Sequence, residues 1–181
     1  MRNRSISGSR SPIRQPAAGN EGPYTLLFDV WLLARVTLGV LDAAIADSGI
    51  NADEFALYSL IRVEGPLTPT ELARWTAIPL TTLSSQVRRL ERRGHIQRVP
   101  HGSDRRSYRI DLTDAGRSAH ALASERCLPV LRQVEKALSR PPGKQRSALK
   151  ELEHLLREAG ALPAPVSRAR PTPPATSLYG G

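Results

Sequence analysis

Arginine and hydroxyl side chains are concentrated in the middle of this chain, in types and spacing that suit binding to a nucleic acid. Between Arg88 and Arg109 the sequence has eight arginines and two acidic residues, so this short segment carries +6 of the formal net charge of +9. Arginine binds phosphate and guanine through two parallel hydrogen bonds, and serine and threonine hydroxyls both donate and accept at base edges. The segment therefore suggests recognition of a polyanion with base contacts made alongside.

The composition of the whole chain is compatible with that partner and with a helical fold. The chain has 181 residues, of which 40% are hydrophobic but only 4% are aromatic, a balance that favours helices over a sandwich or barrel. This length is sufficient for one domain with a core and helical extensions. A GC-rich genome would also raise the number of arginines, so the position of the cluster is more informative than the total.

The segment Leu80–Arg93 is expected to form a helix with one apolar and one polar face. At about 100° per residue, one narrow arc contains the apolar side chains Leu80, Leu83, Val87 and Leu90. The opposite arc has small hydroxyls near the start and arginines after them, which a helix that enters the major groove requires. An ordinary solvated face is the alternative, but it would carry a more balanced charge. The candidate DNA-contacting residues of this helix are Thr81, Thr82, Ser84, Ser85, Arg88 and Arg89.

A short helix is expected directly before the arginine-rich one. Thr68 is typical of an N-cap, Pro69 occupies a position that needs no amide hydrogen, and Glu71 completes a capping box. The sequence Ala77-Ile78-Pro79 then breaks the helix, so two short helices are joined by a tight turn, which is the helix-turn-helix pattern. The candidate contacts to the DNA backbone in this helix are Thr68 and Thr70.

Two strands connected by a basic loop are expected after the helix pair. Residues 96–99 and 107–112 have strand composition, and apolar and polar residues alternate in the second of them. The connection at 100–106 is polar and basic, as in the wing of a winged helix. The candidate DNA-contacting residues of the wing are Ser103, Asp104, Arg105 and Arg106.

Helices are expected on both sides of this DNA-binding part, which spans residues 50–112. Residues 24–48 have an apolar face that is wider than a small domain needs, which indicates a partner helix from another subunit. Residues 113–159 have the pattern of a long helix, with a kink expected at Pro129, and of a last helix after it. The expected fold is mainly α with a small β-wing, a winged helix-turn-helix domain with N- and C-terminal dimerisation helices.

Both ends of the chain have a composition typical of disorder. Residues 1–23 form a basic arm rich in Arg, Ser, Gly and Pro, and residues 160–181 form a Pro-rich tail. The arginines of the arm could contact DNA, or the arm could be a solvated tail, and the sequence leaves both interpretations open.

The central motifs resemble those of the MarR family of bacterial winged-helix transcriptional regulators, over about residues 24–159. The residues that carry the resemblance are Leu72-Ala73, Val87–Gly94, Asp104, Arg106, Leu112-Thr113 and Gly116. The resemblance implies a homodimer held by the first helix and the last two helices. Each subunit would place its recognition helix in a major groove of double-stranded DNA and Arg106 in the flanking minor groove, with Asp104 holding Arg106.

The resemblance also implies a repressor that binds a near-palindromic operator and is released by a small, often aromatic effector. The effector-binding residues stay unknown. Ala77 stands where the turn of the family often has Gly, and Gln86 replaces a commonly apolar residue. Ser85 stands where Arg is frequent, so the base preference of relatives cannot be transferred to this chain.

No pattern in the sequence indicates an enzyme, a cofactor or a metal site. The chain lacks a phosphate-binding glycine loop, a metalloprotease motif and a nucleophile elbow. Cys127 is the only cysteine, and a packing role is favoured over a redox role. No segment has the pattern of a membrane span, which favours a cytoplasmic protein. The alternative function is a winged-helix module that binds another protein without specific DNA binding.

Overall fold

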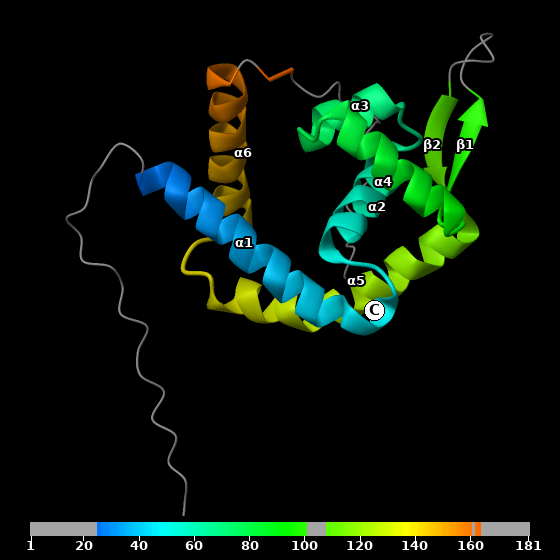
Figure 1. Ribbon diagram of the computed structural model, residues 1–181. Coiled ribbons are helices and arrows are strands. Elements are labelled where there is room, and N and C mark those ends of the chain that lie inside the picture. The colour runs from blue at the N-terminus through cyan, green and yellow to red at the C-terminus, as the bar shows by residue number, and fades with distance from the viewer. Residues whose placement is uncertain (1–24, 101–107, 161, 164–181) are drawn as a thin grey trace, which may run out of the picture. The chain divides into compact units, whose positions relative to one another are not determined.

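The computed structural model of the chain describes residues 25–100, 108–160 and 162–163. Its elements are, in order, α1 (Thr25–Ile45), a short 3-10 helix η1 (Ala46–Ser48), α2 (Ala52–Glu64), α3 (Pro69–Thr76), α4 (Leu80–Arg92), β1 (Ile96–Pro100), β2 (Tyr108–Leu112), α5 (Asp114–Ala137) and α6 (Pro142–Ala159) (Figure 1). The expected fold class, mainly helical with a small wing sheet, is thus confirmed. The chain divides into two compact units between Thr37 and Leu38, so the first part of α1 is described by itself.

At the predicted starts of α2 and α3, side chains cap the first turn of the helix. The Asn51 side chain accepts a hydrogen bond from the Glu54 amide, and the Glu54 carboxylate accepts one from the Asn51 amide. The same reciprocal box joins Thr68 and Glu71 at the start of α3. Such boxes satisfy two amide groups that have no partner inside the helix, which explains why these local signals locate helix ends well.

Both C-terminal helices contain proline. Helix α5 continues through Pro129, as the sequence pattern of one long helix predicts. Helix α6 begins at Pro142, inside the stretch Pro141-Pro142-Gly143, because proline is well accommodated in the first turn of a helix.

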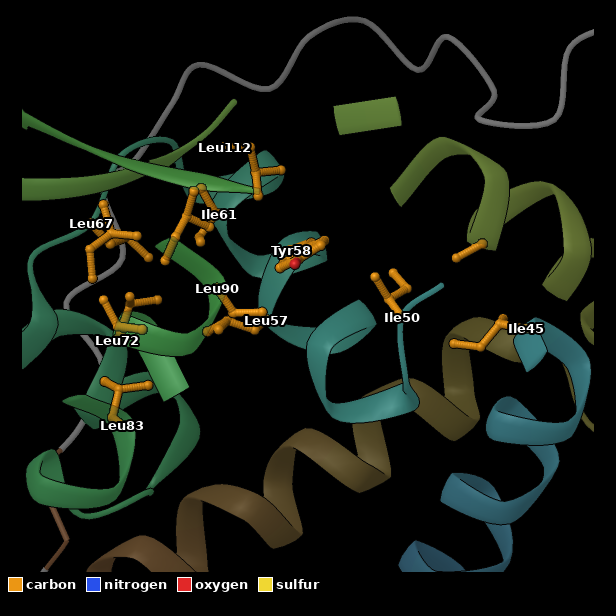
Figure 2. Close-up of a cluster of buried hydrophobic side chains, with 14 of the residues drawn as sticks. Ile45, Ile50, Leu57, Tyr58, Ile61, Leu67, Leu72, Leu83, Leu90 and Leu112 are labelled. Atoms are coloured by element: carbon orange, nitrogen blue, oxygen red, sulfur yellow. The ribbon is translucent and has the colours of Figure 1, made fainter. Parts of the chain in front are cut away.

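Helices α2, α3 and α4 share one hydrophobic core with β2. Figure 2 shows Tyr58 and Ile61 of α2 pointing toward leucines from the other elements. The largest side chains that are fully buried include Tyr58, Ile61, Leu67, Leu72, Leu83, Leu90, Ile110 and Leu112. The helix-turn-helix is therefore anchored by apolar packing, and burial of each large side chain contributes about 1.5–3 kcal/mol.

Strands β1 and β2 form an antiparallel pair in which Ile96 lies opposite Leu112 and Pro100 opposite Tyr108. Leu67, which precedes α3, adds an isolated bridge to Ile110 of β2. The bridge consists of two backbone hydrogen bonds, of 3.1 Å and 2.7 Å. The hairpin is in this way attached to the start of the helix-turn-helix.

The first turn of α5 lies directly against the end of the helix-turn-helix unit. A Cβ atom added at Gly116 would lie 2.0 Å from the backbone oxygen of His95. The Thr113 amide donates to that same oxygen at 3.0 Å, and the Thr113 hydroxyl donates to the Gly94 carbonyl. Glycine is required at position 116 because a side chain there would push α5 away from this contact.

Candidate nucleic-acid interface

Helix α4 has the two faces that its sequence predicts, with one exception. Leu83, Val87 and Leu90 are buried at 0–2% exposure and attach the helix to the core. Leu80 was expected to join them, but it is 47% exposed. Leu80 is the first residue of α4 and lies beyond the end of the core, so its position in the apolar arc does not bring it into the packing.

The hydroxyl groups of α4 lie on its exposed side. Thr81, Thr82 and Ser85 are exposed, whereas Ser84 is partly buried. The Ser84 hydroxyl donates to the Leu80 carbonyl at 2.7 Å, and the Ser85 hydroxyl donates to the Thr82 carbonyl at 2.7 Å. Each serine oxygen keeps lone pairs that can accept from a base amino group, so these contacts leave the expected readout chemically possible.

Arg88 and Arg92 are the cations on α4 that point away from the protein core. Both are exposed, and among the described residues neither forms an ion pair. At about 100° per residue, they lie on the same side of the helix as Ser85, opposite Val87 and Leu90. This arrangement presents two free guanidinium groups and a hydroxyl to anything that docks along α4.

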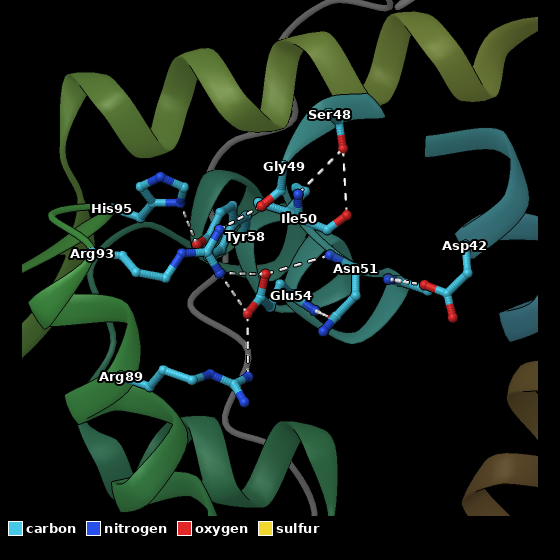
Figure 3. Close-up of polar contacts among 11 residues, drawn as sticks. Asp42, Ser48, Gly49, Ile50, Asn51, Glu54, Tyr58, Arg89, Arg93 and His95 are labelled. Atoms are coloured by element: carbon cyan, nitrogen blue, oxygen red, sulfur yellow. Dashed lines mark hydrogen bonds and ion pairs between the residues drawn. The ribbon is translucent and has the colours of Figure 1, made fainter. Parts of the chain in front are cut away.

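Arg89 and Arg93 differ from these two because a buried carboxylate binds both of them. Glu54 is 5% exposed, and Figure 3 shows its carboxylate between the two guanidinium groups. The Arg89 Nη2 atom lies 3.1 Å from Glu54 Oε1, and Arg93 Nη1 lies 2.8 Å and 2.9 Å from the two oxygens. Arg93 also donates to the Gly49 carbonyl. Arg89, a predicted DNA contact, is thus held partly by the protein itself, although half of its side chain stays exposed.

The same cluster continues to a tyrosine and a histidine. The Tyr58 hydroxyl and His95 Nδ1 are 2.9 Å apart (Figure 3). Burial, with a smaller effect of the Glu54 charge, raises the pKa of Tyr58 to about 12. Burial and the neighbouring Arg93 charge lower the pKa of His95. A neutral His95 that accepts from the Tyr58 hydroxyl is the state that fits these shifts.

A second ion pair, which sequence reasoning missed, joins α4 to the wing. Arg98 of β1 donates to Glu91 of α4 at 2.6 Å and 2.9 Å. The Arg98 guanidinium also lies 4.4 Å from the centre of the Tyr108 ring. The two charges are seven positions apart and a turn lies between them, so no helical spacing rule could have indicated this pair. It aligns the base of the hairpin with the recognition helix.

The remaining predicted contacts are placed only in part. Ser103, Asp104, Arg105 and Arg106 lie outside the described residues, although the strands on either side of them are paired as expected. Thr70 is exposed in the first turn of α3. The Thr68 hydroxyl is used inside the capping box, where it accepts from the Glu71 amide at 3.2 Å.

Other groups singled out in the sequence form no obvious chemical site. Cys127 is 1% exposed, and burial raises the pKa of its thiol, which fits a packing role. No three His, Cys, Asp or Glu side chains among the described residues lie close enough to hold a metal ion. In the same part of the chain, none of the helices combines the length and the apolar character that a membrane crossing demands.

The fold and the basic face of α4 together define a winged helix-turn-helix protein, and comparison with known proteins agrees. Residues 55–107 match the sequence model of the MarR family. The transcriptional regulator PecS of Dickeya dadantii is 34% identical over 90 residues, which are 46% of this chain and 54% of PecS. The transcriptional repressor NicR of Pseudomonas putida is 30% identical over 88 residues, which are 49% of this chain and 53% of NicR. The chain spans about half the length of these curated relatives.

Solved structures extend the likeness over more of the chain. The Mycobacterium tuberculosis transcriptional regulator MosR, solved in complex with DNA, is 26% identical with a TM-score of 0.61, and the match covers 75% of this chain and 96% of MosR. Reduced AbfR bound to DNA has the same fold, with a TM-score of 0.62 at 23% identity over 74% of this chain and 91% of that one. Residues 55–107 therefore resemble the MarR family in sequence, and the larger part of the chain shares the winged-helix fold of these solved structures.

Proposed function

We propose that this protein is a sequence-specific regulator of transcription that binds double-stranded DNA as a homodimer and acts as a repressor. The observation that carries the proposal is the division of α4 into a buried apolar face and an exposed face of hydroxyls and arginines, of which Arg88 and Arg92 form no ion pair with any described residue. The names of PecS and NicR and the DNA complex of MosR support the same function. A protein with this partner would work in the cytoplasm, where the bacterial chromosome lies.

In the proposed complex, α4 lies in the major groove and the wing lies beside the flanking minor groove. Hydroxyls near the helix start would face base edges, and Arg88 would reach a guanine or a phosphate. Backbone contacts would come from the start of α3, at Thr70. The wing contribution would come from Asp104 and Arg106. Arg89 would share its guanidinium between DNA and Glu54.

The proposed homodimer would be formed by the terminal helices, at about residues 24–48 and 113–159. The side chains of Phe28, Trp31 and Leu33 on α1 are more than half exposed, as are those of Leu149 and Leu155 on α6. On each of these helices, large apolar side chains at the surface indicate a protein interface. Two copies related by a two-fold axis would bind half-sites about one helical turn apart in a near-palindromic operator.

Release by a small aromatic effector is part of the proposal and has a candidate site between α2 and α5. A hollow of about 560 Å³ lies there, lined by apolar side chains such as Phe55, Val63 and Leu128 together with serine, histidine, arginine and glutamate side chains. Phe55 and His120 stack on its wall with ring centres 5.1 Å apart, and Arg62 supplies a cation. Its size and lining are typical of small-ligand sites. A panel of phenolic and aromatic carboxylate compounds should contain some that dissociate the protein from DNA.

The test of the main proposal is a gel-shift assay with the duplex that lies upstream of the protein's own gene. Specific retardation at physiological salt, in the presence of excess competitor DNA, is the expected result. Binding that competitor DNA removes completely would instead favour the alternative, a winged-helix module whose basic face serves an acidic protein partner. Footprinting of the retarded complex would then show whether two half-sites are protected.

A further inference from the structure

One arginine joins the end of the last helix to the end of the first helix of the helix-turn-helix. The Arg157 guanidinium, in the last turn of α6, donates from Nη1 to the Arg74 carbonyl and from Nη2 to the Trp75 carbonyl, both at 2.9 Å. Its third nitrogen, Nε, donates to Glu153 at 2.9 Å. The side chain is only 12% exposed, so it is a built contact between segments that are more than 80 residues apart.

In this contact, Arg157 of α6 caps the C-terminal end of α3. The last carbonyls of a helix have no partner within the helix, and they carry the negative end of its dipole. The planar fork of arginine can satisfy two neighbouring carbonyls at once, which a lysine ammonium cannot do in the same geometry. Glu153 fixes the fork by holding its third nitrogen.

The capped end of α3 determines where the recognition helix begins. Helix α3 ends at Thr76, and only three residues separate it from α4. The first of them, Ala77, has a φ of 55°. This left-handed conformation is energetically unfavourable for a residue that has a side chain. Helix α4 has no side-chain cap of its own at its N-terminus. The first turn of α4 therefore depends in part on how the end of α3 is held, while Leu83, Val87 and Leu90 anchor the rest of the helix.

Packing alone does not fill the junction between α3, α4 and the end of α6. A hollow of about 360 Å³ lies there, and its wall includes Arg157, Ile78 and Leu80. Side chains that leave such a space restrict the relative movement of helices less than a close-packed contact does. The hydrogen bonds of Arg157 are therefore the directional part of this connection.

We infer that Arg157 is a positioning residue for DNA binding, through which the last helix holds the helix-turn-helix at the angle that specific operator binding requires. The inference rests on the proposed function, and it names a residue that does not itself touch DNA. Arg157 donates to the carbonyls of Arg74 and Trp75, more weakly to that of Pro163, and to the Glu153 carboxylate, so its positive charge is directed into the protein and away from a ligand.

The experiment compares the variants Arg157→Gln and Arg157→Lys with Arg146→Gln, which removes the same charge from an exposed position on the same helix. Hydrogen–deuterium exchange of the full chain without DNA reports on the amides of residues 76–83. Binding is measured with two probes, the duplex upstream of the protein's own gene and a duplex of unrelated sequence, each over a range of salt concentrations. Thermal unfolding of every variant shows whether it is folded at the assay temperature.

The expected result is selective. In Arg157→Gln the amides of residues 76–83 exchange faster, and affinity for the upstream duplex falls about 10-fold, in keeping with the loss of hydrogen bonds from a charged donor. Affinity for the unrelated duplex and the salt slope stay unchanged. Arg157→Lys recovers only part of the loss, because one ammonium group replaces the fork. Arg146→Gln behaves like the wild type in all assays.

Two results would overturn the inference. Equal losses on both duplexes with a shallower salt slope would mean that Arg157 contacts phosphate directly. Unchanged exchange and unchanged affinity would mean that the contact positions nothing. Failure of the proposed function has a different signature, because the wild-type protein itself would then not prefer the upstream duplex over the unrelated one.

Discussion

The carboxylate of Glu54 and the guanidinium of Arg93 form a two-oxygen ion pair, with the Nη1 atom 2.8 Å and 2.9 Å from the two oxygens. The pair joins the first turn of α2 to the residue that follows α4, and Glu54 is almost completely buried. Glu54 serves the capping box of α2 at the same time. One carboxylate thus connects a helix start, the C-terminal end of the recognition helix and, through Arg89, a predicted DNA contact.

Replacing Glu54 by Gln should destabilise the fold by about 2 kcal/mol, since it leaves two guanidinium groups without their carboxylate. The partial exposure of Arg89 and Arg93 keeps the loss below that of a fully buried pair. Urea unfolding of Glu54→Gln measures this loss of stability. Asp53→Asn, at the exposed neighbour in the same helix turn, is the control and should cost no more than about 0.5 kcal/mol. Equal losses in the two variants would contradict the importance of the pair.

Gly116→Ala should destabilise the protein by more than about 2 kcal/mol, because a methyl group cannot share the space of the His95 carbonyl. Relief would require α5 to move away from the helix-turn-helix. Gly143→Ala is the matched control, since a Cβ there meets nothing within 4 Å. The control should be neutral or slightly stabilising, as alanine is the better helix former. Thermal and urea unfolding measure the change in stability of the two variants.

Arg88→Ala and Arg89→Ala should separate DNA binding from stability. Arg88 forms no ion pair among the described residues, so its loss should weaken DNA binding by about 1–3 kcal/mol with little effect on unfolding. Arg89 is bound by Glu54, so its loss should cost more stability and less affinity than the loss of Arg88. Fluorescence anisotropy with an operator duplex measures the affinity, and urea unfolding measures the stability. A larger loss of stability and a smaller loss of affinity in Arg88→Ala than in Arg89→Ala would exclude the proposed orientation of α4.

Arg106→Ala should weaken binding to operator DNA and lower the salt slope by about one, if the wing contacts the DNA backbone at the minor groove. The measurement is the affinity as a function of salt concentration. Arg126→Ala, at an exposed position on α5, removes the same charge elsewhere and should change neither quantity. Unaltered affinity in Arg106→Ala would remove the wing from the proposed interface.

The stability of the protein should decrease as the pH falls below about 6.5, partly because of His95. Burial and the Arg93 charge lower the pKa of His95 below its ordinary value of 6.5. The unfolded chain therefore binds a proton at a higher pH than the folded protein, and protonation favours unfolding. Urea midpoints between pH 5 and pH 8 should fall less steeply in His95→Gln than in the wild type.

Much of the fold could be predicted from the sequence because its signals are local. The capping boxes at Asn51 and Thr68 involve residues three positions apart, so they form as soon as the helix does. The division of α4 into two faces depends only on the helical repeat. The hydroxyls and arginines of α4 could be named as candidates for this reason, and the order of helices and strands followed from the same kind of pattern.

The tertiary structure alone decided which of these side chains are free. Arg88 and Arg89 are neighbours of identical type, yet within the described part of the chain only Arg89 meets a carboxylate, which comes from a residue 35 positions away. The capping of α3 by Arg157 joins residues 82 and 83 positions apart, and no periodicity encodes such a pair. Sequence determined the elements and the chemistry that they carry, because backbone hydrogen bonding and helical spacing act over a few residues. Packing between distant segments decided which charges face a ligand and which hold the protein together, because ion pairs depend on proximity in space.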